Sequence, residues 1–448
     1  MHDLIVLGAG PGGYEAAARA GRMGKKTAIV EKQYLGGTCL NVGCIPTKVF
    51  LKSSKLYTDC KNSRAYGVEI SSLQFDLAAL LERKNKVVGS LVQGVETLLK
   101  RSGVEVIRGQ GKLTSRNTLQ VGAESYQAKN ILIATGSRPA TPPIPGLDSA
   151  DVLDSNSVFG LTALPAKVAI VGGGYIGLEF ASFFAGVGSQ VTVFEMLPLI
   201  AAGCDRDISN RLLQELKKQG ISIKTSCKVS SISKGAVEYV ASDGASARLE
   251  ADCVLNATGR APVVEDIGLE QAGVDFDRKG IKTSDRGRTS VPGIWACGDV
   301  TGRRLLAHAA TREGLVAVAN MFGGDERIRY HAIPSVIYTH PEVASVGRTE
   351  DELQAQGIEY KKSVVPMALS GRFLIENPSG SGIAKVLVGA KYGEILGVHI
   401  IGDLSSEFIV AAAAMIETEM CVSDVAEIVF PHPTVSEAMK EAILRAAE

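Results

Sequence analysis

Two cysteines, Cys39 and Cys44, lie close together in a segment that reads GTCLNVGCIPTK. Such a pair could form a metal site, a structural disulfide or a redox-active disulfide. A zinc site needs four convergent ligands, but the six histidines of the chain are dispersed and none lies near this segment. A structural disulfide is disfavoured because the eight cysteines are scattered, which fits a reducing compartment. Redox chemistry requires the two Cα atoms to lie within about 4.4–6.8 Å of each other.

The local sequence suggests how the two thiols could meet. Residues five positions apart on an ideal helix are farther apart than a disulfide allows, so Gly43 and the preceding Gly-Gly-Thr must distort the first turn. If the pair opens a helix, the positive end of the helix should lower a thiol pKa and favour the thiolate. The segment also follows closely on Glu31, the end of the first repeated unit described next.

A strand, a glycine loop, a helix and a second strand ending in an acid occur twice in the chain. The loops have the pattern G-x-G-x-x-G, at Gly8, Gly10 and Gly13 and again at Gly172, Gly174 and Gly177. In both copies the acid, Glu31 or Glu195, stands at the same offset of about 20 residues from the middle glycine. This context predicts two dinucleotide sites, with phosphates at the helix N-terminus and the acid on a ribose.

The second acid also indicates which nicotinamide cofactor binds. A carboxylate repels the 2′-phosphate of NADP, which normally pairs with arginine. After Glu195 the chain continues as MLPLIAAG, with no positive charge before Arg206. NAD is therefore favoured over NADP at the second loop.

Length and composition limit the other possibilities. A chain of 448 residues is too long for one hydrophobic core. Lys plus Arg and Asp plus Glu are 48 each, so we expect no general nucleic-acid binding. No apolar run reaches the ~20 residues of a membrane span, and strand-like sequence from Asp3 argues against a secretory signal. We therefore expect a cytoplasmic protein without a metal site and without a membrane partner.

The motifs appear in an order that resembles the pyridine nucleotide-disulfide oxidoreductases, and within them the dihydrolipoamide dehydrogenases. The resemblance covers essentially the whole chain. Its motifs are GAGPGGY, GGTCLNVGCIPTK, ATGSRP, GGGYIGLE, ATGRAP, WACGDV, LLAHAA, YTHPEVASVG and HPTVSEA. It implies an α/β fold with two Rossmann-like domains, one binding FAD and one binding NAD, and a C-terminal α+β dimerisation domain. The FAD domain is expected over 1–145, the NAD domain over 146–264, a return to the FAD domain over 265–330, and the dimerisation domain over 331–448. A proline-rich linker from Pro139 and a change near His331 to strand-like segments followed by a helical one agree with these divisions.

The resemblance also implies the residues of each site. The FAD site is expected at Gly8, Gly10, Pro11, Gly12, Gly13, Glu31, Lys32, Gly37, Thr38, Lys48, Gly111, Thr135, Gly136, Ser137, Asp299, Leu305, Leu306, Ala307 and His308. The NAD site is expected at Gly172, Gly174, Tyr175, Ile176, Gly177, Glu179, Glu195, Val229 and Gly259. Lys48 is expected near the reactive nitrogen of the flavin, paired with Glu179, and Tyr175 resembles the aromatic gate over the nicotinamide pocket of related reductases.

The resemblance implies a dithiol oxidation that reduces NAD⁺. Dihydrolipoyl groups would attack the Cys39–Cys44 disulfide, with Cys39 as the interchange thiol and Cys44 against the flavin. His432, oriented by Glu437, would take up the thiol proton from the partner subunit of a homodimer. The expected partner is a lipoylated acyltransferase (E2) of a 2-oxoacid dehydrogenase complex or the glycine-cleavage H-protein.

Other readings stay open at this point. A glutathione-type reductase would carry arginines where this chain has Glu195 and an apolar run. A mercuric or selenium-type thioredoxin reductase would add a C-terminal redox pair, and this chain ends in LRAAE. A flavin-containing subunit that binds a partner without redox chemistry is disfavoured by the complete set of Cys39, Cys44, His432 and Glu437.

Overall fold

A computed structural model describes residues 1–378 and 380–448. The chain forms two compact units. The first comprises Met1–Val49, Ala78–Ala140 and Gly259–Ile328, and the second comprises Phe50–Leu77, Thr141–Thr258 and Arg329–Glu448. Both units are assembled from segments that are far apart in the sequence.

The first unit is built on a seven-stranded sheet with the order β3-β2-β1-β6-β5-β4, and β19 also pairs with β6. The strands are β1 (His2–Leu7), β2 (Thr27–Glu31), β3 (Glu105–Arg108), β4 (Gly111–Ser115), β5 (Thr118–Val121), β6 (Glu124–Ile133) and β19 (Ile294–Ala296). The pairs β3-β2, β2-β1, β1-β6 and β6-β19 are parallel. Their carboxyl ends therefore meet at one edge, where open α/β sheets bind ligands.

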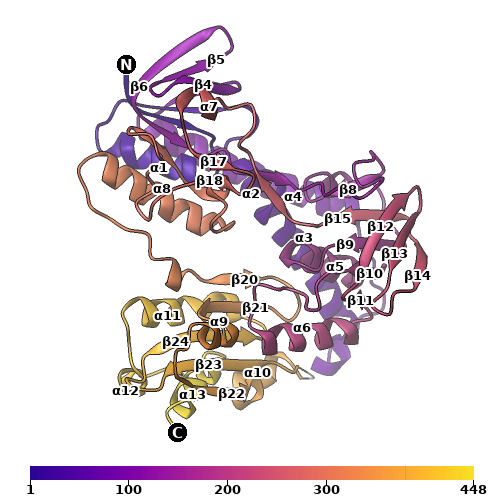
Figure 1. Cartoon of the computed structure of the whole chain (residues 1–448). Helices are drawn as coiled ribbons and strands as arrows, with labels where there is room; N and C mark the ends of the chain where they lie inside the picture. The colour runs from indigo at the N-terminus through magenta and orange to yellow at the C-terminus, as the bar shows by residue number, and fades with distance from the viewer. Residues whose placement is uncertain (379) are drawn as a thin grey trace. The chain divides into compact units, whose positions relative to one another are not determined.

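Strand β1 shows why this sheet is buried on both faces. Leu4 and Val6 point into one hydrophobic core and Ile5 and Leu7 into another, as the period of two requires. Helices α1 (Pro11–Arg22) and α8 (Ala307–Met321) lie side by side (Figure 1). They approach so closely that a Cβ at Gly314 would lie 2.4 Å from the Gly12 carbonyl oxygen.

The first unit also contains the short helices α2 (Gly37–Val42) and α7 (Leu269–Ala272). Two longer helices, α3 (Cys44–Lys61) and α4 (Leu77–Arg101), include residues of both units. The two-stranded pairs are β7 (Ser137–Pro139) with β16 (Arg260–Pro262) and β17 (Phe276–Asp277) with β18 (Gly280–Ile281).

The second unit contains a parallel sheet with the order β11-β10-β9-β15-β8. These strands are β8 (Val152–Asp154), β9 (Lys167–Val171), β10 (Gln190–Phe194), β11 (Ser222–Lys224) and β15 (Cys253–Asn256). Helices α5 (Tyr175–Gly186) and α6 (Arg206–Lys218) connect its strands. A separate antiparallel sheet of β12 (Lys228–Ser233), β13 (Ala236–Val240) and β14 (Ser246–Glu250) shares a hydrophobic core with it.

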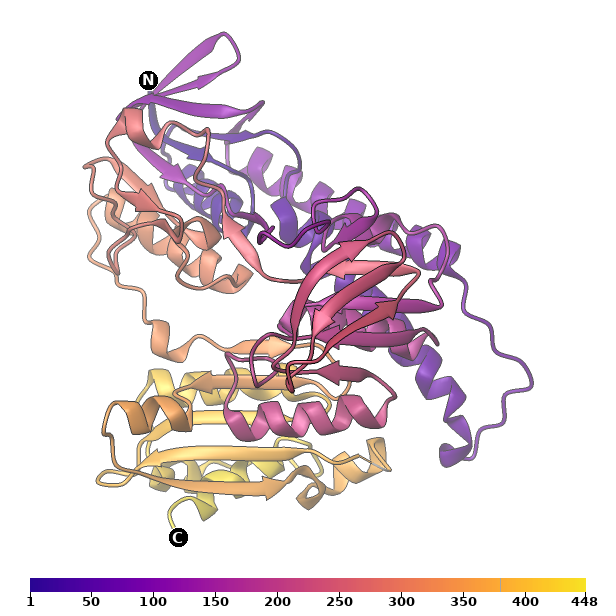
Figure 2. The same cartoon turned by 45° about the vertical axis from the view of Figure 1, so that its right-hand side comes forward.

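The C-terminal part of the second unit, in orange and yellow in Figures 1 and 2, is an antiparallel sheet with helices. Its strand order is β20-β21-β24-β23-β22. The strands are β20 (Ser335–Ile337), β21 (Val343–Gly347), β22 (Tyr360–Pro366), β23 (Ile383–Gly389) and β24 (Ile395–Ile401), and the helices are α9 (Glu350–Ala355), α10 (Gly371–Glu376), α11 (Ser405–Glu417), α12 (Val422–Glu427) and α13 (Glu437–Arg445). Helix α11 packs on β21 and β24, and α13 packs on β22 and β23.

The predicted fold class is confirmed, with two Rossmann-like sheets and a C-terminal α+β layer. The return of the chain to the first sheet is visible in β19, which pairs with β6 after the whole parallel sheet of the second unit has intervened. The boundaries expected at 145, 264 and 330 remain predictions.

Candidate active site

The two cysteines lie on consecutive short helical segments. Cys39 is in α2, and Cys44 is the first residue of α3. Between them Gly43 leaves helical geometry, with φ −140° and ψ −112°. The predicted distortion is therefore a break between two helices, and it lies at the glycine that the sequence singled out.

The thiols of Cys39 and Cys44 are hydrogen-bonded to each other. This contact, followed by burial, raises the pKa of the Cys39 thiol above its ordinary value, while the charge of Lys48 acts in the opposite direction. Cys44, and not Cys39, begins α3, so the expectation that a helix N-terminus lowers a thiol pKa applies to Cys44 and remains a prediction. Tyr14 lies close by, and burial, Glu15 and Cys39 together raise the pKa of its phenol to about 12.

Two glycines bring the cysteine segment against the first glycine loop. Gly36 and Gly37 have φ of +87° and +60°, a backbone region that favours glycine. A Cβ at Gly37 would lie only 2.6 Å from the Gly10 Cα atom. The start of α2 therefore contacts the loop at which α1 begins.

The first glycine loop fits a dinucleotide phosphate. Gly8 has φ +103°, and a Cβ there would lie 2.4 Å from the Ala134 carbonyl oxygen. A Cβ at Gly13 would lie 2.0 Å from the Gly8 carbonyl oxygen, so this glycine permits close packing of helix on strand. Gly10, the N-cap of α1, has no atom within 4 Å of its Cβ position. The open space lies where a phosphate approaches the helix N-terminus.

The second glycine loop repeats this geometry. A Cβ at Gly172 would lie 2.2 Å from the Ala257 carbonyl oxygen, and one at Gly177 would lie 2.1 Å from the Gly172 carbonyl oxygen. Gly174, the N-cap of α5, again has open space at its Cβ position. The chain thus contains two loops with the same division of roles among their three glycines.

Each predicted ribose-binding acid is also bonded to its own glycine loop. The carboxylate of Glu31 accepts hydrogen bonds from the backbone amides of Ala9 (2.8 Å) and Gln33 (2.7 Å). Glu195 accepts from the amides of Gly173 and Leu197, both at 2.7 Å. The sequence predicted the acids at these positions but not this second role. Each carboxylate oxygen retains acceptor capacity for a ribose hydroxyl.

The other residues expected at the FAD site gather at the same edge of the first sheet. Thr135 and Gly136 follow β6, and the Ala134 amide donates to the Leu7 carbonyl oxygen at 2.8 Å. Asp299 follows β19 and accepts a hydrogen bond from the Ser137 hydroxyl at 2.5 Å. Lys48 lies in the second turn of α3, and the others lie at or next to the start or end of an element: Pro11, Gly12, Lys32, Thr38, Gly111, Leu305, Leu306, Ala307 and His308.

The residues expected at the NAD site lie mostly at the carboxyl ends of the second unit's strands. Tyr175 and Ile176 open α5 after β9, Val229 is buried near the start of β12, and Gly259 comes after β15 as the first residue of a segment of the first unit. The Tyr175 hydroxyl lies 3.5 Å from the Cys204 sulfur, a contact that the sequence did not reveal. Glu179 is buried in α5 and accepts from the Tyr338 amide at 3.0 Å.

His432 and Glu437 form the predicted pair. The imidazole Nδ1 lies 2.9 Å from Glu437 Oε1, and Glu437 Oε2 accepts from the Thr434 amide at 2.8 Å. These two hydrogen bonds, the backbone one first, lower the pKa of the Glu437 carboxyl. The His432 side chain is 79% exposed, so its Nε2 edge is available to a second molecule. The pairing of Lys48 with Glu179 remains a prediction.

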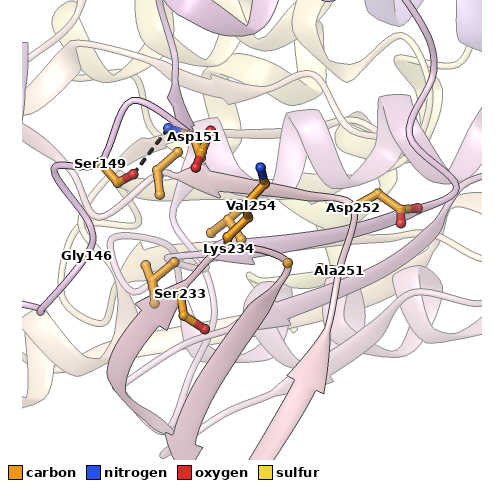
Figure 3. A pocket seen from close by; sticks show the side chains of 11 residues that line it. Gly146, Ser149, Asp151, Ser233, Lys234, Ala251, Asp252 and Val254 are labelled. Atoms are coloured by element: carbon orange, nitrogen blue, oxygen red, sulfur yellow. Dashed lines mark hydrogen bonds between the residues drawn. The ribbon is translucent and has the colours of Figure 1, made fainter.

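A small pocket in the second unit lies away from the second glycine loop. Its lining includes Asp151, Lys234 and Asp252, and the Asp151 amide donates to the Ser149 hydroxyl (Figure 3). The pocket adjoins the first residues of β8 and β15, whereas the glycine loop follows the last residue of β9. It therefore lies at the edge opposite to the one where nucleotides bind.

No group of three or more His, Cys, Asp or Glu side chains within residues 1–378 and 380–448 could hold a metal ion. No helix in the same ranges is long and apolar enough to cross a membrane.

Known families match nearly the whole chain. The family model described as pyridine nucleotide-disulphide oxidoreductase matches residues 2–314, and the model of its dimerisation domain matches residues 333–443. The chain belongs to the pyridine nucleotide-disulphide oxidoreductase family. It is therefore a flavin-dependent disulfide oxidoreductase that uses FAD and NAD, and its C-terminal layer is the dimerisation domain of the family.

Individual relatives agree with the family. Mitochondrial dihydrolipoyl dehydrogenase of Dictyostelium discoideum is 39% identical, over 100% of this chain and 94% of that protein. Dihydrolipoyl dehydrogenase 3 of Pseudomonas aeruginosa is 40% identical, over 99% of this chain and 97% of that protein. The solved structure of the HOCl-induced flavoprotein disulfide reductase RclA from Escherichia coli matches with a TM-score of 0.88 and 28% identity, over 98% of this chain and 99% of that one.

Proposed function

We propose that this chain oxidises protein-bound dihydrolipoyl groups to the lipoyl disulfide and reduces NAD⁺ to NADH. The observation that carries the proposal is the contact of the Cys39 and Cys44 thiols beside the first dinucleotide loop. The similarity to dihydrolipoyl dehydrogenases over the full chain supports dihydrolipoyl as the substrate.

The cysteines exchange disulfides with the substrate in two steps. A dihydrolipoyl thiolate attacks Cys39 of the oxidised pair, forms a mixed disulfide and releases Cys44 as a thiolate. The second dihydrolipoyl thiol then displaces Cys39, which leaves the lipoyl disulfide and two reduced cysteines. FAD and NAD⁺ supply the hydride chemistry that removes the two electrons from the pair.

Proton transfer is assigned to His432. The exchange needs a base because only a thiolate attacks a disulfide, and the dihydrolipoyl thiol must lose its proton before it can do so. Glu437 fixes the imidazole with its Nδ1 toward the carboxylate, so Nε2 is the nitrogen that exchanges the proton. The segment is exposed, with Val429 90% accessible, which supports a homodimer in which His432 serves the partner subunit's cysteines.

The cofactor assignment and the biological setting are parts of the same proposal. Glu195 and the uncharged stretch that follows it favour NAD over NADP. We assign the FAD and NAD residues to the sites expected from the sequence, with Lys48 near the flavin and paired with Glu179. The partner is a lipoylated acyltransferase or a glycine-cleavage H-protein, and the location is cytoplasmic.

Replacement of Cys44 by serine tests the proposal. We expect Cys44→Ser to lower dihydrolipoamide-linked NAD⁺ reduction by more than about 1,000-fold, because the serine cannot form the disulfide. Cys60→Ser is the matched control, since Cys60 lies on the same helix outside the pair, and it should retain the parent rate. Near-parental activity of Cys44→Ser would contradict the proposal. Bleaching of the flavin on addition of dihydrolipoamide would exclude a subunit without redox chemistry.

A further inference from the structure

Arg260, which follows the second Ala-Thr-Gly segment, reaches into the proposed flavin site. It begins β16, which pairs antiparallel with β7, where Ser137 lies. The Arg260 side chain is only 12% exposed. Its Nε donates to the Ser137 hydroxyl at 2.7 Å, and a second guanidinium nitrogen donates to the Ser137 carbonyl oxygen at 2.7 Å. One residue thus fixes both the side chain and the backbone of Ser137.

The chemistry of the guanidinium gives this contact a direction. Arginine can only donate hydrogen bonds, so the Ser137 oxygen must accept from it. The Ser137 hydroxyl must therefore donate its own proton to another group, and Asp299 Oδ2 accepts it at a distance of 2.5 Å. The order Arg260, Ser137, Asp299 is therefore a directed chain of hydrogen bonds that ends on a carboxylate.

The backbone next to Asp299 is also held in place. Gly298, the residue before Asp299, has φ +76° and donates its amide to Glu313 Oε2 at 2.6 Å. Glu313 lies in α8 and is 1% exposed. Burial raises the pKa of Asp299, while the Ser137 hydrogen bond and the Arg260 charge lower it. Loss of Arg260 would remove both an orienting contact and a favourable charge, 4.0 Å from Asp299 Oδ2.

We propose that Arg260 is a positioning residue for the flavin, which keeps Ser137 and Asp299 oriented so that the Asp299 carboxylate can accept a hydroxyl of the cofactor's ribityl chain. This inference rests on the proposed assignment of Ser137 and Asp299 to the FAD site. Arg260 acts through these two residues, and none of the sequence motifs assigned it a role.

The neighbouring Arg138 provides a matched control. It lies on the same two-stranded ribbon and pairs with Glu265 at the surface, where its side chain is 52% exposed. FAD release from the diluted full-length holoprotein, followed by the increase in flavin fluorescence, gives the Kd of each variant. We expect Arg260→Gln to weaken FAD binding at least 10-fold and Arg138→Gln to change it less than 2-fold. Arg260→Lys should recover part of the loss, because lysine keeps the charge but cannot make both contacts.

A double-mutant cycle with Asp299→Asn separates positioning from general destabilisation. If Arg260 acts through Asp299, the double variant should bind FAD little more weakly than Asp299→Asn alone. The inference is overturned if Arg260→Gln matches Arg138→Gln, or if the two losses multiply independently. In either case, weaker FAD binding by Asp299→Asn would still support the proposed flavin site. An Asp299→Asn variant with unchanged affinity would overturn the site and the inference together.

Discussion

Lys385 should contribute more to stability than any exposed lysine near it. It lies in β23 with 1% of its side chain exposed, and its Nζ contacts Asp205 (2.9 Å), Asp207 (2.6 Å) and Glu350 (2.5 Å). Burial lowers the pKa of Lys385, but these carboxylates outweigh it and the net shift is upward. Asp205 is as deeply buried as the lysine, so Lys385→Met would leave a buried carboxylate without its cation.

The expected cost follows from this geometry. Removing one partner of a buried ion pair destabilises a protein by about 3–5 kcal/mol, because the remaining charge stays desolvated. Lys362 offers the comparison, since it contacts the same Glu350 at 2.8 Å but is 50% exposed. An exposed pair of this kind contributes about 0–1 kcal/mol. The Lys385→Met variant should therefore lose several times more stability than Lys362→Met.

Urea unfolding of both variants at pH 7, with hydrogen exchange at the start of α6, measures the difference. Asp205 caps that helix by accepting from the Asp207 amide at 3.0 Å, so exchange there should accelerate only in Lys385→Met. Adding Asp205→Asn to Lys385→Met should recover part of the stability. A loss below about 1 kcal/mol in Lys385→Met, equal to that of Lys362→Met, would refute the reasoning.

Two further predictions concern other paired carboxylates. Burial alone would raise the pKa of Asp403, but His340 and Lys55 bring it to about 2, from an ordinary 3.8. The stabilisation from this pairing is fully present above about pH 4 and is lost as pH falls from 4 to 2. Asp403→Asn should therefore lower the free energy of unfolding by about 2 kcal/mol at pH 7 and flatten the acid side of a plot of stability against pH. An unchanged plot would contradict this prediction. Replacing Glu437 by Gln should lower kcat roughly 10- to 100-fold and move the acidic limb of the pH–rate profile, which reports the essential base, to lower pH, because the imidazole loses the neighbouring negative charge. Glu441→Gln, which removes a partner of Arg445 on the same helix, should leave that profile unchanged, and equal effects of the two variants would argue against His432 as the base.

Local patterns predicted most of the fold. Each glycine loop follows a buried β-branched strand and precedes a helix, so the neighbouring residues alone indicate the unit. The break at Gly43 was also foreseeable, since a glycine stands next to the second cysteine in a segment that could not be one regular helix. These features depend on residues close together in the sequence, where periodicity and turn chemistry are informative.

Features that depend on distant residues could not be read in this way. Lys385 stands in the apolar strand IAKVLVG, and only the three carboxylates from α6 and α9 explain its burial. The raised pKa of Cys39 depends on how close the two sulfurs lie, which a helix-dipole argument ignores. Arg260 joins β16 to residues more than 100 positions earlier, and its neighbours in the sequence give no sign of it.

The contacts of Glu31 and Glu195 with their own loops affect how a cofactor is acquired. Each carboxylate accepts a hydrogen bond from a backbone amide of the turn that must receive the pyrophosphate. The loop therefore keeps its shape before any nucleotide arrives, and little of the binding free energy is spent on ordering the backbone. A loop held in this way is preformed, so an apoprotein made from this chain should take up FAD as a docking event rather than as a folding event.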